Sequence, residues 1–384
     1  MTASAPRVIV VGGGVCGLGV GWQLARRGAD VTLFERDEPA QAATWAAAGM
    51  LAPHMELRPE EESITELGRE SLRRWRRFAA EVQADSGLSV DYRDEGTLFV
   101  ALDRDAEEQQ RFLHRHQQEL GLPVRWLSGR DVRDCEPHLS RRITAGLFSP
   151  DDHQVDARLL GAALARAFQR VGGRLRARSP VEQILTEAGR VVGVRVGGSE
   201  VLADAVLLAA GAWSGLVGGP QLNTAPPVRP VKGQMLAVRQ TDPPLLTHAV
   251  WARDATEIVY LVPKSDGRLL VGATVEEAGF DTRVTAGGML RLLRLAWQAL
   301  PAIDDLPLVE SWAGLRPGSR DGAPILGRTT VRGLFVATGH YRNGILFAPV
   351  TAEDMARLIM ADELSDTIAP FGPERFADRD HRMR

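Results

Sequence analysis

The first forty residues alternate between short apolar runs and a stretch with helical character. Residues 8–11 form a β-branched run, residues 12–14 a glycine turn, and residues 15–28 have a helical pattern. A second apolar run follows at residues 31–34. Short apolar runs around a glycine turn and an amphipathic stretch predict a strand–helix–strand unit with a parallel sheet.

The alternation continues along the rest of the chain. We expect helices over residues 62–86, 104–120, 289–300 and 349–360, and a further helix that starts after a strand end at His153. Strand-like runs lie between them, at residues 92–102, 181–187, 191–196, 205–215, 257–263, 268–274 and 333–339. This order predicts a mixed α/β and α+β fold, with one Rossmann-like domain and an interleaved domain built on a mainly antiparallel sheet. We expect the polar residues 371–384 to form a loose tail.

The charge balance narrows the classes of partner. The net charge of -3 gives no electrostatic footprint for nucleic acid, and we expect the arginines of residues 62–86 to lie on a solvated helix face. Lys232 and Lys264 are the only lysines, against 44 arginines. A single arginine is therefore informative only in an unusual context.

Residues 8–25 carry no formal charge, a length that approaches a membrane span. Six glycines weaken any helix there, so we expect neither a membrane span nor a secretion signal. Cys16 and Cys135 form no disulfide framework, which is typical of a reducing cytoplasm. His114 and His116 would point to different faces of a helix, and we expect no metal site.

Gly12, Gly14 and Gly17 have the spacing of a dinucleotide-binding fingerprint, after a strand and at the start of a helix. The first permits the tight turn, the second lets the backbone approach a pyrophosphate, and the third lets helix and strand pack closely. Glu35 ends the second strand, where a carboxylate accepts hydrogen bonds from both ribose hydroxyls of an adenosine. An acid disfavours a 2′-phosphate, so the pattern predicts FAD or NAD; the alternative is a glycine-rich turn that binds nothing.

The segment TWAAAGMLAP, residues 44–53, is small and apolar just after the second strand. Such a segment lets the backbone pass close over a flat ring system, which favours FAD over NAD. On pattern alone it is also compatible with the start of a buried helix.

Three segments together resemble the D-amino-acid oxidase superfamily of FAD-dependent amine oxidases. They are residues 8–36, residues 46–53 and the C-terminal pair 312–327 and 337–349. Within the superfamily, the chain is most similar to the glycine oxidases, which are linked to thiamine biosynthesis. The resemblance runs over almost the whole chain.

The resemblance implies a substrate site at Tyr260, Arg316 and Arg342. The planar fork of an arginine binds a carboxylate in a fixed orientation, and Arg316 is our candidate for that role. The alternative is a structural ion pair of Arg316 with Asp321 or Glu310, and Tyr260 is also compatible with an ordinary aromatic residue on a strand. For Arg342 two roles stay open: direct substrate binding, or positive charge near the reduced flavin.

The resemblance also implies that FAD is bound non-covalently. Its implied contacts come from Val15, Cys16, Glu35, Arg36, Thr44, Ala48, Gly49, Met50, Val181, His340, Tyr341, Arg342, Asn343, Gly344, Ile345 and Leu346. Trp45 departs from the family pattern, which has a small polar residue there, and Ile258 and Val275 beside the pocket leave the fine substrate preference open.

The implied FAD-binding domain comprises residues 1–88, 150–225 and 317–370, and the substrate domain comprises residues 89–149 and 226–316. The implied activity is oxidative deamination of glycine and other small amines to the imine and glyoxylate, with release of ammonia and hydrogen peroxide. We expect a cytoplasmic homo-oligomer, with a tetramer as the form the family suggests, that uses oxygen and feeds thiamine thiazole biosynthesis.

Other functions stay open at the level of sequence. Sarcosine or a small D-amino acid is an alternative substrate, and a dehydrogenase would pass electrons to a carrier other than oxygen. An NAD-dependent dehydrogenase would explain the fingerprint but not residues 46–53. A non-enzymatic FAD-binding protein would need neither Arg316 nor Tyr260.

Overall fold

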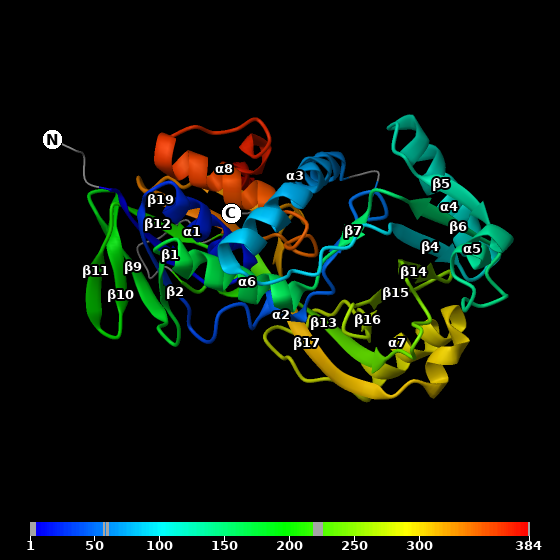
Figure 1. The fold of residues 1–384 in the computed structure, drawn as a ribbon. Coiled ribbons are helices and arrows are strands. Elements are labelled where there is room, and N and C mark those ends of the chain that lie inside the picture. Colours follow the sequence, from blue (N-terminus) through cyan, green and yellow to red (C-terminus); the bar gives the residue numbers. More distant parts are fainter. Residues whose placement is uncertain (1–4, 57, 59–60, 218–225, 383–384) are drawn as a thin grey trace.

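The molecule contains two large sheets, one in each half, and a three-stranded sheet lies beyond the first of them (Figure 1). The computed structural model describes residues 5–56, 58, 61–217 and 226–382. The expected range 150–225 therefore ends outside the described residues. No helix in the described part of the chain is both long and apolar enough to cross a membrane.

The first sheet has six strands in the order β18-β19-β12-β1-β2-β8. The strands are β1 (Arg7–Val11), β2 (Asp30–Phe34), β8 (Arg174–Arg176), β12 (Ala205–Leu208), β18 (Ile325–Arg328) and β19 (Leu334–Thr338). All neighbouring pairs are parallel except β18–β19. The predicted strand–helix–strand unit is confirmed as β1, α1 (Val15–Arg26) and β2.

Strand β1 is buried on both faces, as the apolar run predicts. Val8 and Val10 pack towards the helices α1, α6 (Ala157–Arg170) and α8 (Ala348–Ala361). Ile9 and Val11 pack on the opposite face against a three-stranded sheet of β9 (Val181–Glu187), β10 (Arg190–Val196) and β11 (Ser199–Leu202). The period-two alternation thus sends side chains into two separate cores.

The second sheet has eight strands in the order β17-β13-β16-β15-β14-β4-β6-β5. They are β4 (Thr97–Ala101), β5 (Arg125–Ser128), β6 (Ala145–Ser149), β13 (Val228–Arg239), β14 (Ala249–Arg253), β15 (Ile258–Pro263), β16 (Arg268–Gly272) and β17 (Leu308–Ser319). Only β14–β4 is parallel. The helices α4 (Arg104–Glu119), α5 (Gly129–Cys135) and α7 (Ala286–Ala299) accompany this sheet, so the predicted fold class is confirmed.

Short elements join the two sheets. The helix α2 (Ala43–Ala46) precedes β3 (Met50–Leu51), which pairs with β7 (His153–Gln154). Short 3-10 helices lie at Gly211–Trp213, Pro301–Asp305, Ala369–Phe371 and Pro373–Arg382. The expectation of a loose tail from residue 371 is wrong at its start, because Phe371 is buried and Arg375 forms an ion pair with Asp321.

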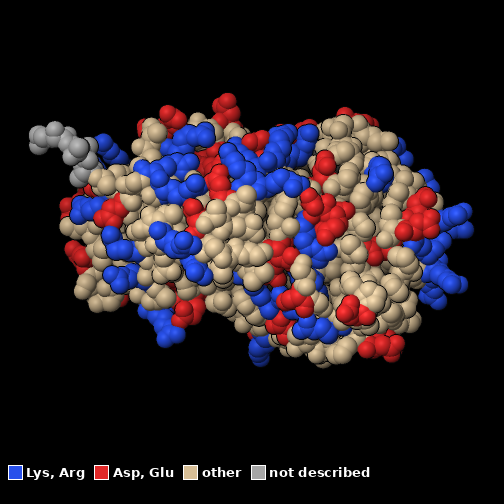
Figure 2. All heavy atoms as spheres, viewed as in Figure 1, with Lys and Arg blue, Asp and Glu red and all other residues tan. Residues whose placement is uncertain are grey.

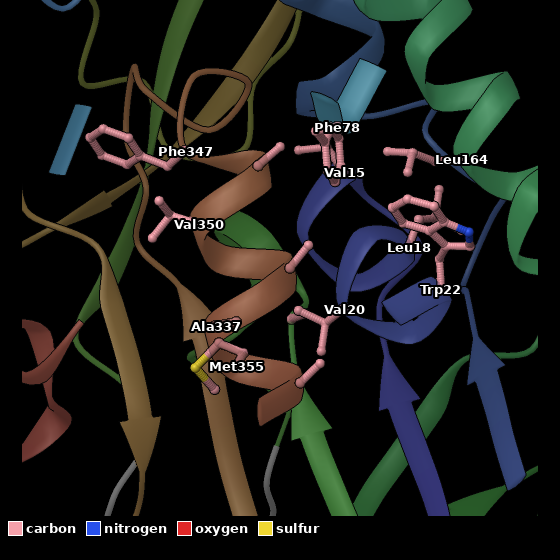
Figure 3. Close-up of a cluster of buried hydrophobic side chains, with 14 of the residues drawn as sticks. Val15, Leu18, Val20, Trp22, Phe78, Leu164, Ala337, Phe347, Val350 and Met355 are labelled. Atoms are coloured by element: carbon pink, nitrogen blue, oxygen red, sulfur yellow. The ribbon is translucent and has the colours of Figure 1, made fainter. Parts of the chain in front are cut away.

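The helix α3 (Glu62–Ser86) packs along the first sheet's helices through large aromatic side chains. Trp22 of α1 and Trp75 of α3 each form an edge-to-face contact with Phe78, at centroid distances of 5.5 and 5.4 Å. Figure 3 shows Trp22 and Phe78 among the buried side chains of this core. Such pairs contribute about 0.5–1.5 kcal/mol beyond their buried area. The shapes of these packed rings therefore determine which side of α3 faces the core.

The opposite side of α3 carries the arginine cluster, and not all of it is solvated as expected. Arg74 is half-buried and bridges Glu70 to Asp354 of α8. Arg73 and Arg77 are exposed and pair with carboxylates as well. Charges of both signs intermingle over this face of the molecule (Figure 2). The cluster thus ties α3 to α8.

One buried carbonyl group joins α3 to the segment that leads into α8. Ser71 Oγ and Trp75 Nε1 both donate to the Leu346 oxygen, at 2.7 and 2.8 Å. Leu346 lies in the turn that precedes α8. The position of this turn therefore depends on α3, which is distant in sequence.

We expect the substitutions Ser71→Ala and Trp75→Phe to be non-additive. Each single change leaves the Leu346 carbonyl one donor, whereas the double change leaves a buried acceptor unsatisfied, at a cost of about 1–3 kcal/mol beyond the sum. Urea unfolding of the wild type, both single variants and the double variant measures this coupling energy. A value near zero would contradict the shared role.

Candidate active site

A cavity of about 1780 Å³ lies between the two large sheets. Its lining comes from the fingerprint turn, the segment after β2, the strands β13, β14, β15 and β17, and the turn before α8. Cavities that bind drug-sized ligands are usually about 300–1000 Å³. This cavity has room for a dinucleotide together with a small substrate.

The fingerprint glycines are required by close backbone contacts. Gly12 has a positive φ of 106°, and a Cβ atom there would lie 2.5 Å from the Ala209 oxygen. A Cβ atom on Gly17 would lie 2.0 Å from the Gly12 oxygen. Gly12 and Gly14 line the cavity, whereas Gly17 does not and serves the packing of α1 on β1. These are the separate roles that the spacing predicts.

Glu35 follows β2 and lines the cavity, and its carboxylate is held by the backbone. One oxygen accepts from the Gly13 N–H at 2.6 Å and the other from the Asp37 N–H at 2.9 Å. Each carboxylate oxygen can accept a further hydrogen bond. The orientation suits the two hydroxyl groups of a ribose.

Beyond Glu35, the cavity is lined by an arginine and an aromatic ring that face each other. The Arg36 guanidinium lies 4.3 Å from the centroid of Trp213, which stacks on Phe280 at 5.5 Å. Val181 also lines this end. Planar, apolar groups of this kind suit a nucleobase. Trp213 lies in the strand-like run predicted at residues 205–215, but this pattern did not indicate a role for it in a site.

Several backbone N–H groups along the cavity have no acceptor within the described residues. They belong to Gly14, Ala48, Gly49, Gly344 and Ile345. Unpaired backbone donors are costly unless water or a ligand accepts from them. Gly14 lies at the N-terminus of α1, where an anion is favoured, and the other donors suit the carbonyl and nitrogen edge of a flavin. The cavity therefore fits FAD in both its phosphate and its ring portions.

Neutral side chains surround part of this cradle. Burial raises the pKa of Cys16 to about 12 and lowers the pKa of His340 to about 4, so both are uncharged near neutral pH. Cys16 Sγ lies 3.5 Å from His340 Nε2, which also contacts Thr351 Oγ1 at 3.0 Å. His340 is thereby fixed as a neutral wall of the cavity.

Tyr260 and Arg316, the two residues predicted to bind substrate, both line the cavity, and glycines make room for both. A Cβ atom on Gly272 would lie 2.6 Å from the Tyr260 ring, and one on Gly233 would lie 2.4 Å from the Arg316 guanidinium. Burial raises the pKa of Tyr260, and the neighbouring Arg316 opposes this shift. The phenol is therefore protonated, and among the described residues its hydroxyl finds only the weak acceptor Met235 Sδ, at 3.6 Å.

Arg316 has no carboxylate partner within the described residues. Its Nη1 donates to the Thr274 oxygen at 3.0 Å and to the Lys232 oxygen at 3.3 Å. Of the two acids considered as structural partners, Glu310 pairs with Arg158 and Asp321 with Arg375. Only Nη1 is used in the bonds to these two oxygens, so the guanidinium has further donors for an anion in the cavity.

Arg342 differs from Arg316, because it is already paired. It forms an ion pair with Glu56 at 3.1 Å and a second one with Glu61. Burial raises the pKa of Glu56 to about 7, although Arg342 opposes the shift. Glu56 lines the cavity and was not identified from the sequence. Both roles considered for Arg342 stay predictions.

Three departures from the family pattern also line the cavity. Trp45 is covered by Arg158, whose guanidinium lies 3.7 Å from its ring centroid, and packs edge-on against Trp312. Ile258 and Val275 are exposed apolar side chains in the lining. This part of the wall is therefore apolar.

The structure brings most of the predicted residues together. The lining includes Gly12, Gly14, Val15, Cys16, Glu35, Arg36, Thr44, Ala48, Gly49, Met50, Val181, Tyr260, Arg316, His340, Tyr341, Arg342, Gly344 and Ile345. Gly17, Asn343 and Leu346 lie outside it and act on the backbone, since Asn343 and Leu346 bond within the turn and to α3.

The chain matches the model of one protein family, the FAD dependent oxidoreductases, over residues 7–358. It is 37% identical over 373 residues to a glycine oxidase of Geobacillus kaustophilus, with 96% of each chain covered. It is 35% identical over 379 residues to the bifunctional protein ThiO/ThiG of Trichormus variabilis, of which it spans 55%.

The fold agrees with these sequence matches. The crystal structure of the glycine oxidase from Geobacillus kaustophilus matches with a TM-score of 0.90 at 35% identity, over 97% of this chain and 99% of that one. The resemblance inferred from the motifs is therefore confirmed, and so is FAD as the cofactor. By its family match, its relatives and its fold, the chain belongs to the FAD dependent oxidoreductase family.

Proposed function

We propose that the protein oxidises glycine and other small amines to the imine, while oxygen is reduced to hydrogen peroxide. The imine formed from glycine hydrolyses to glyoxylate and ammonia. The observation that carries this proposal is the unpaired Arg316 guanidinium beside the Tyr260 hydroxyl in the cavity. The 37% identity to a protein named glycine oxidase supports it.

The substrate carboxylate is the group by which the site holds a small amino acid. Arg316 binds it through charge-assisted hydrogen bonds, and Tyr260 donates a further one. Bound FAD supplies the two-electron acceptor for the oxidation of the carbon–nitrogen bond. The protein orients the substrate and excludes water with the apolar wall around Trp45. Arg342, neutralised by Glu56 and Glu61, adds a smaller contribution.

Sarcosine or a small D-amino acid is the second candidate substrate. Ile258 and Val275 place apolar surface in the cavity, which suits a methyl group on the nitrogen or on the α-carbon. A relative that passes electrons to another carrier would share this site.

The wider setting of the enzyme belongs to the same proposal. Residues 1–88, 150–225 and 317–370 form the FAD-binding domain, and residues 89–149 and 226–316 the substrate domain. A cytoplasmic location suits the two free cysteines, Cys16 and Cys135. The identity of 35% to a protein named ThiO/ThiG supports a link to thiamine thiazole biosynthesis.

A homo-oligomer, with a tetramer as one form, is also part of the proposal. Leu290, Leu293 and Trp297 of α7 have exposed fractions of 69%, 39% and 49%. Their spacing of three and four residues puts them on one face of the helix. An exposed apolar face of this kind is typical of an interface, here with a second copy of the chain.

We expect the purified protein to be yellow and to release peroxide with glycine, sarcosine or D-alanine. A peroxide assay over these three amines ranks the substrates, and acid precipitation should free the flavin because its binding is non-covalent. A colourless protein would contradict the proposed flavin-dependent reaction. Bound flavin without turnover of any amine would favour a binding protein.

We expect Arg316→Ala to raise the KM for glycine roughly a hundredfold, because hydrogen bonds to a charged group contribute about 1.5–3 kcal/mol. Its flavin content should stay near that of the wild type. The matched control is Arg328→Ala. Arg328 lies at the end of β18, and its guanidinium forms an ion pair with the exposed Asp362. Unchanged kinetics of Arg316→Ala would remove this residue from the site.

We expect the double substitution Leu290→Glu and Trp297→Glu to lower the mass of the particle in solution, since charges on the α7 face oppose its burial. Light scattering after size-exclusion chromatography measures the mass. The control is Leu202→Glu, an exposed apolar residue on β11. An unchanged oligomer would place the interface elsewhere.

A further inference from the structure

The oxidation of an amine requires a group that takes a proton from the substrate nitrogen. A free amino acid near neutral pH carries an ammonium group, whose nitrogen has no lone pair with which to form a carbon–nitrogen double bond. Arg316 and the protonated Tyr260 serve the substrate carboxylate, and neither of them can accept this proton. An ionised carboxylate on the cavity wall would complete the site.

Within the described residues, six acids line the cavity, and five of them are engaged elsewhere or exposed. Three follow β2 at the ribose end, one on α4 is exposed, and one pairs with Arg294 of α7. The sixth is Glu56, which is mostly buried. The six are Glu35, Asp37, Glu38, Glu56, Glu108 and Glu257.

The backbone that leads to Glu56 is held by a buried acid. The two carboxylate oxygens of Asp152 accept from the His54 N–H at 3.3 Å and from the Met55 N–H at 3.0 Å. The Glu56 N–H donates to the Ala52 oxygen at 3.0 Å. The position of Glu56 in the cavity wall is therefore fixed by hydrogen bonds of the residues that precede it.

The Glu56 carboxylate has one oxygen that accepts no hydrogen bond within the described residues. Oε2 accepts from Arg342 Nε at 3.1 Å, and Oε1 is the oxygen without a donor. Burial is the main cause of the raised pKa of Tyr260, and the negative charge of Glu56 adds to it. Such an effect requires two groups that lie near each other. The carboxylate is therefore close to a residue that holds the substrate.

The charges around Glu56 allow it to become neutral without leaving Arg342 unpaired. Arg342 forms its second ion pair with Glu61, which lies outside the cavity lining. Burial raises the pKa of Glu56 to about 7 against the opposing charge of Arg342. Asp152 adds to this shift and Arg58 opposes it. Burial also lowers the pKa of a bound ammonium group, so the cavity favours the neutral pair of acid and amine.

We propose that Glu56 is a catalytic residue that accepts a proton from the ammonium group of the bound substrate at Oε1. This inference rests on the proposed function, because Arg316 must hold the substrate carboxylate. The transfer converts an ammonium group and a carboxylate into a neutral amine and a carboxylic acid, with no change in total charge. The nitrogen lone pair can then form the double bond to the α-carbon, as the hydrogen and electron pair of that carbon pass to bound FAD. Glu56 returns its proton to water after the product has left.

Steady-state kinetics of the flavin-loaded protein with glycine, measured as a function of pH, tests the proposal. For the wild type we expect kcat/KM to rise with pH through about 7, because Glu56 accepts a proton only in its ionised form. Glu56→Gln should lower kcat/KM at slightly alkaline pH roughly a hundredfold. The remaining activity should keep rising with pH, as the fraction of neutral amine in solution does.

Glu61→Gln is the matched control, because it removes a carboxylate from the same arginine outside the cavity lining. It should keep the rise of kcat/KM through about 7. Glu56→Asp retains an acceptor and should keep part of the activity together with this rise. Equal effects of Glu56→Gln and Glu61→Gln, or a wild-type pH profile in Glu56→Gln, would overturn the inference and leave Glu56 as an ion-pair partner of Arg342.

A binding measurement separates the ammonium contact from turnover. In protein whose flavin has been reduced beforehand and kept free of oxygen, glycine binds without reacting. Propionate is its counterpart, with a methyl group in place of the ammonium group. By calorimetry above the pKa of Glu56, we expect the wild type to bind glycine roughly tenfold more tightly than propionate, and Glu56→Gln to remove this preference. Retained binding of propionate and retained flavin show that the variant is folded.

The outcomes distinguish the inference from the function on which it rests. Oxidation of glycine, with the same binding preference in the wild type and in Glu56→Gln, overturns the role of Glu56 alone. Failure to oxidise any amine, with a glycine preference that depends on Glu56, overturns the proposed function and leaves the ammonium contact in place.

Discussion

The charge of Arg316 is the constraint on which the substrate half of the cavity depends. A half-buried guanidinium loses much of its hydration and must recover hydrogen bonds from the protein. Here the carbonyl groups of Lys232 and Thr274 supply them, and these groups leave the positive charge unbalanced. The nearby acid Glu276 is occupied by Thr274 and Gln234. An anion bound in the cavity completes the electrostatic balance.

The cofactor half is coupled to this charge by the close packing of strand β17 on the short helix α2. A Cβ atom on Gly314 of β17 would lie 2.4 Å from Ala46 Cβ, so the strand that carries Arg316 packs on the segment that lines the ring portion. Lys264 adds a second link, since its Nζ donates to the Val155 oxygen at 2.7 Å, next to β7. The distance between substrate and cofactor residues is therefore set by packing, and mobile side chains contribute little to it.

Much of the fold could be predicted from the sequence, because local rules specify it. The helix at residues 62–86, the unit β1–α1–β2 and the roles of Gly12 and Gly17 follow from periodicity and steric limits. Partners that are distant in sequence could not be predicted. Arg342 pairs with Glu56 across 286 positions, and Trp213 meets Arg36 only in the folded chain. The resemblance identified Arg316 as a site residue. Only the folded chain shows that Asp321 and Glu310, its two possible partners, pair with other arginines.

The contrast between the two site arginines bears on how charge is divided in the cavity. Arg342 is held by two carboxylates, one of which, Glu56, has a pKa of about 7 because of its burial. Near neutral pH this carboxyl group is partly protonated, so the charge that it contributes beside Arg342 changes with pH. Arg316 differs, because it has no carboxylate partner within the described residues and donates to two backbone carbonyl groups. In the proposed function, Arg316 therefore anchors the substrate carboxylate, whereas Arg342, already paired with two carboxylates, adds a smaller contribution.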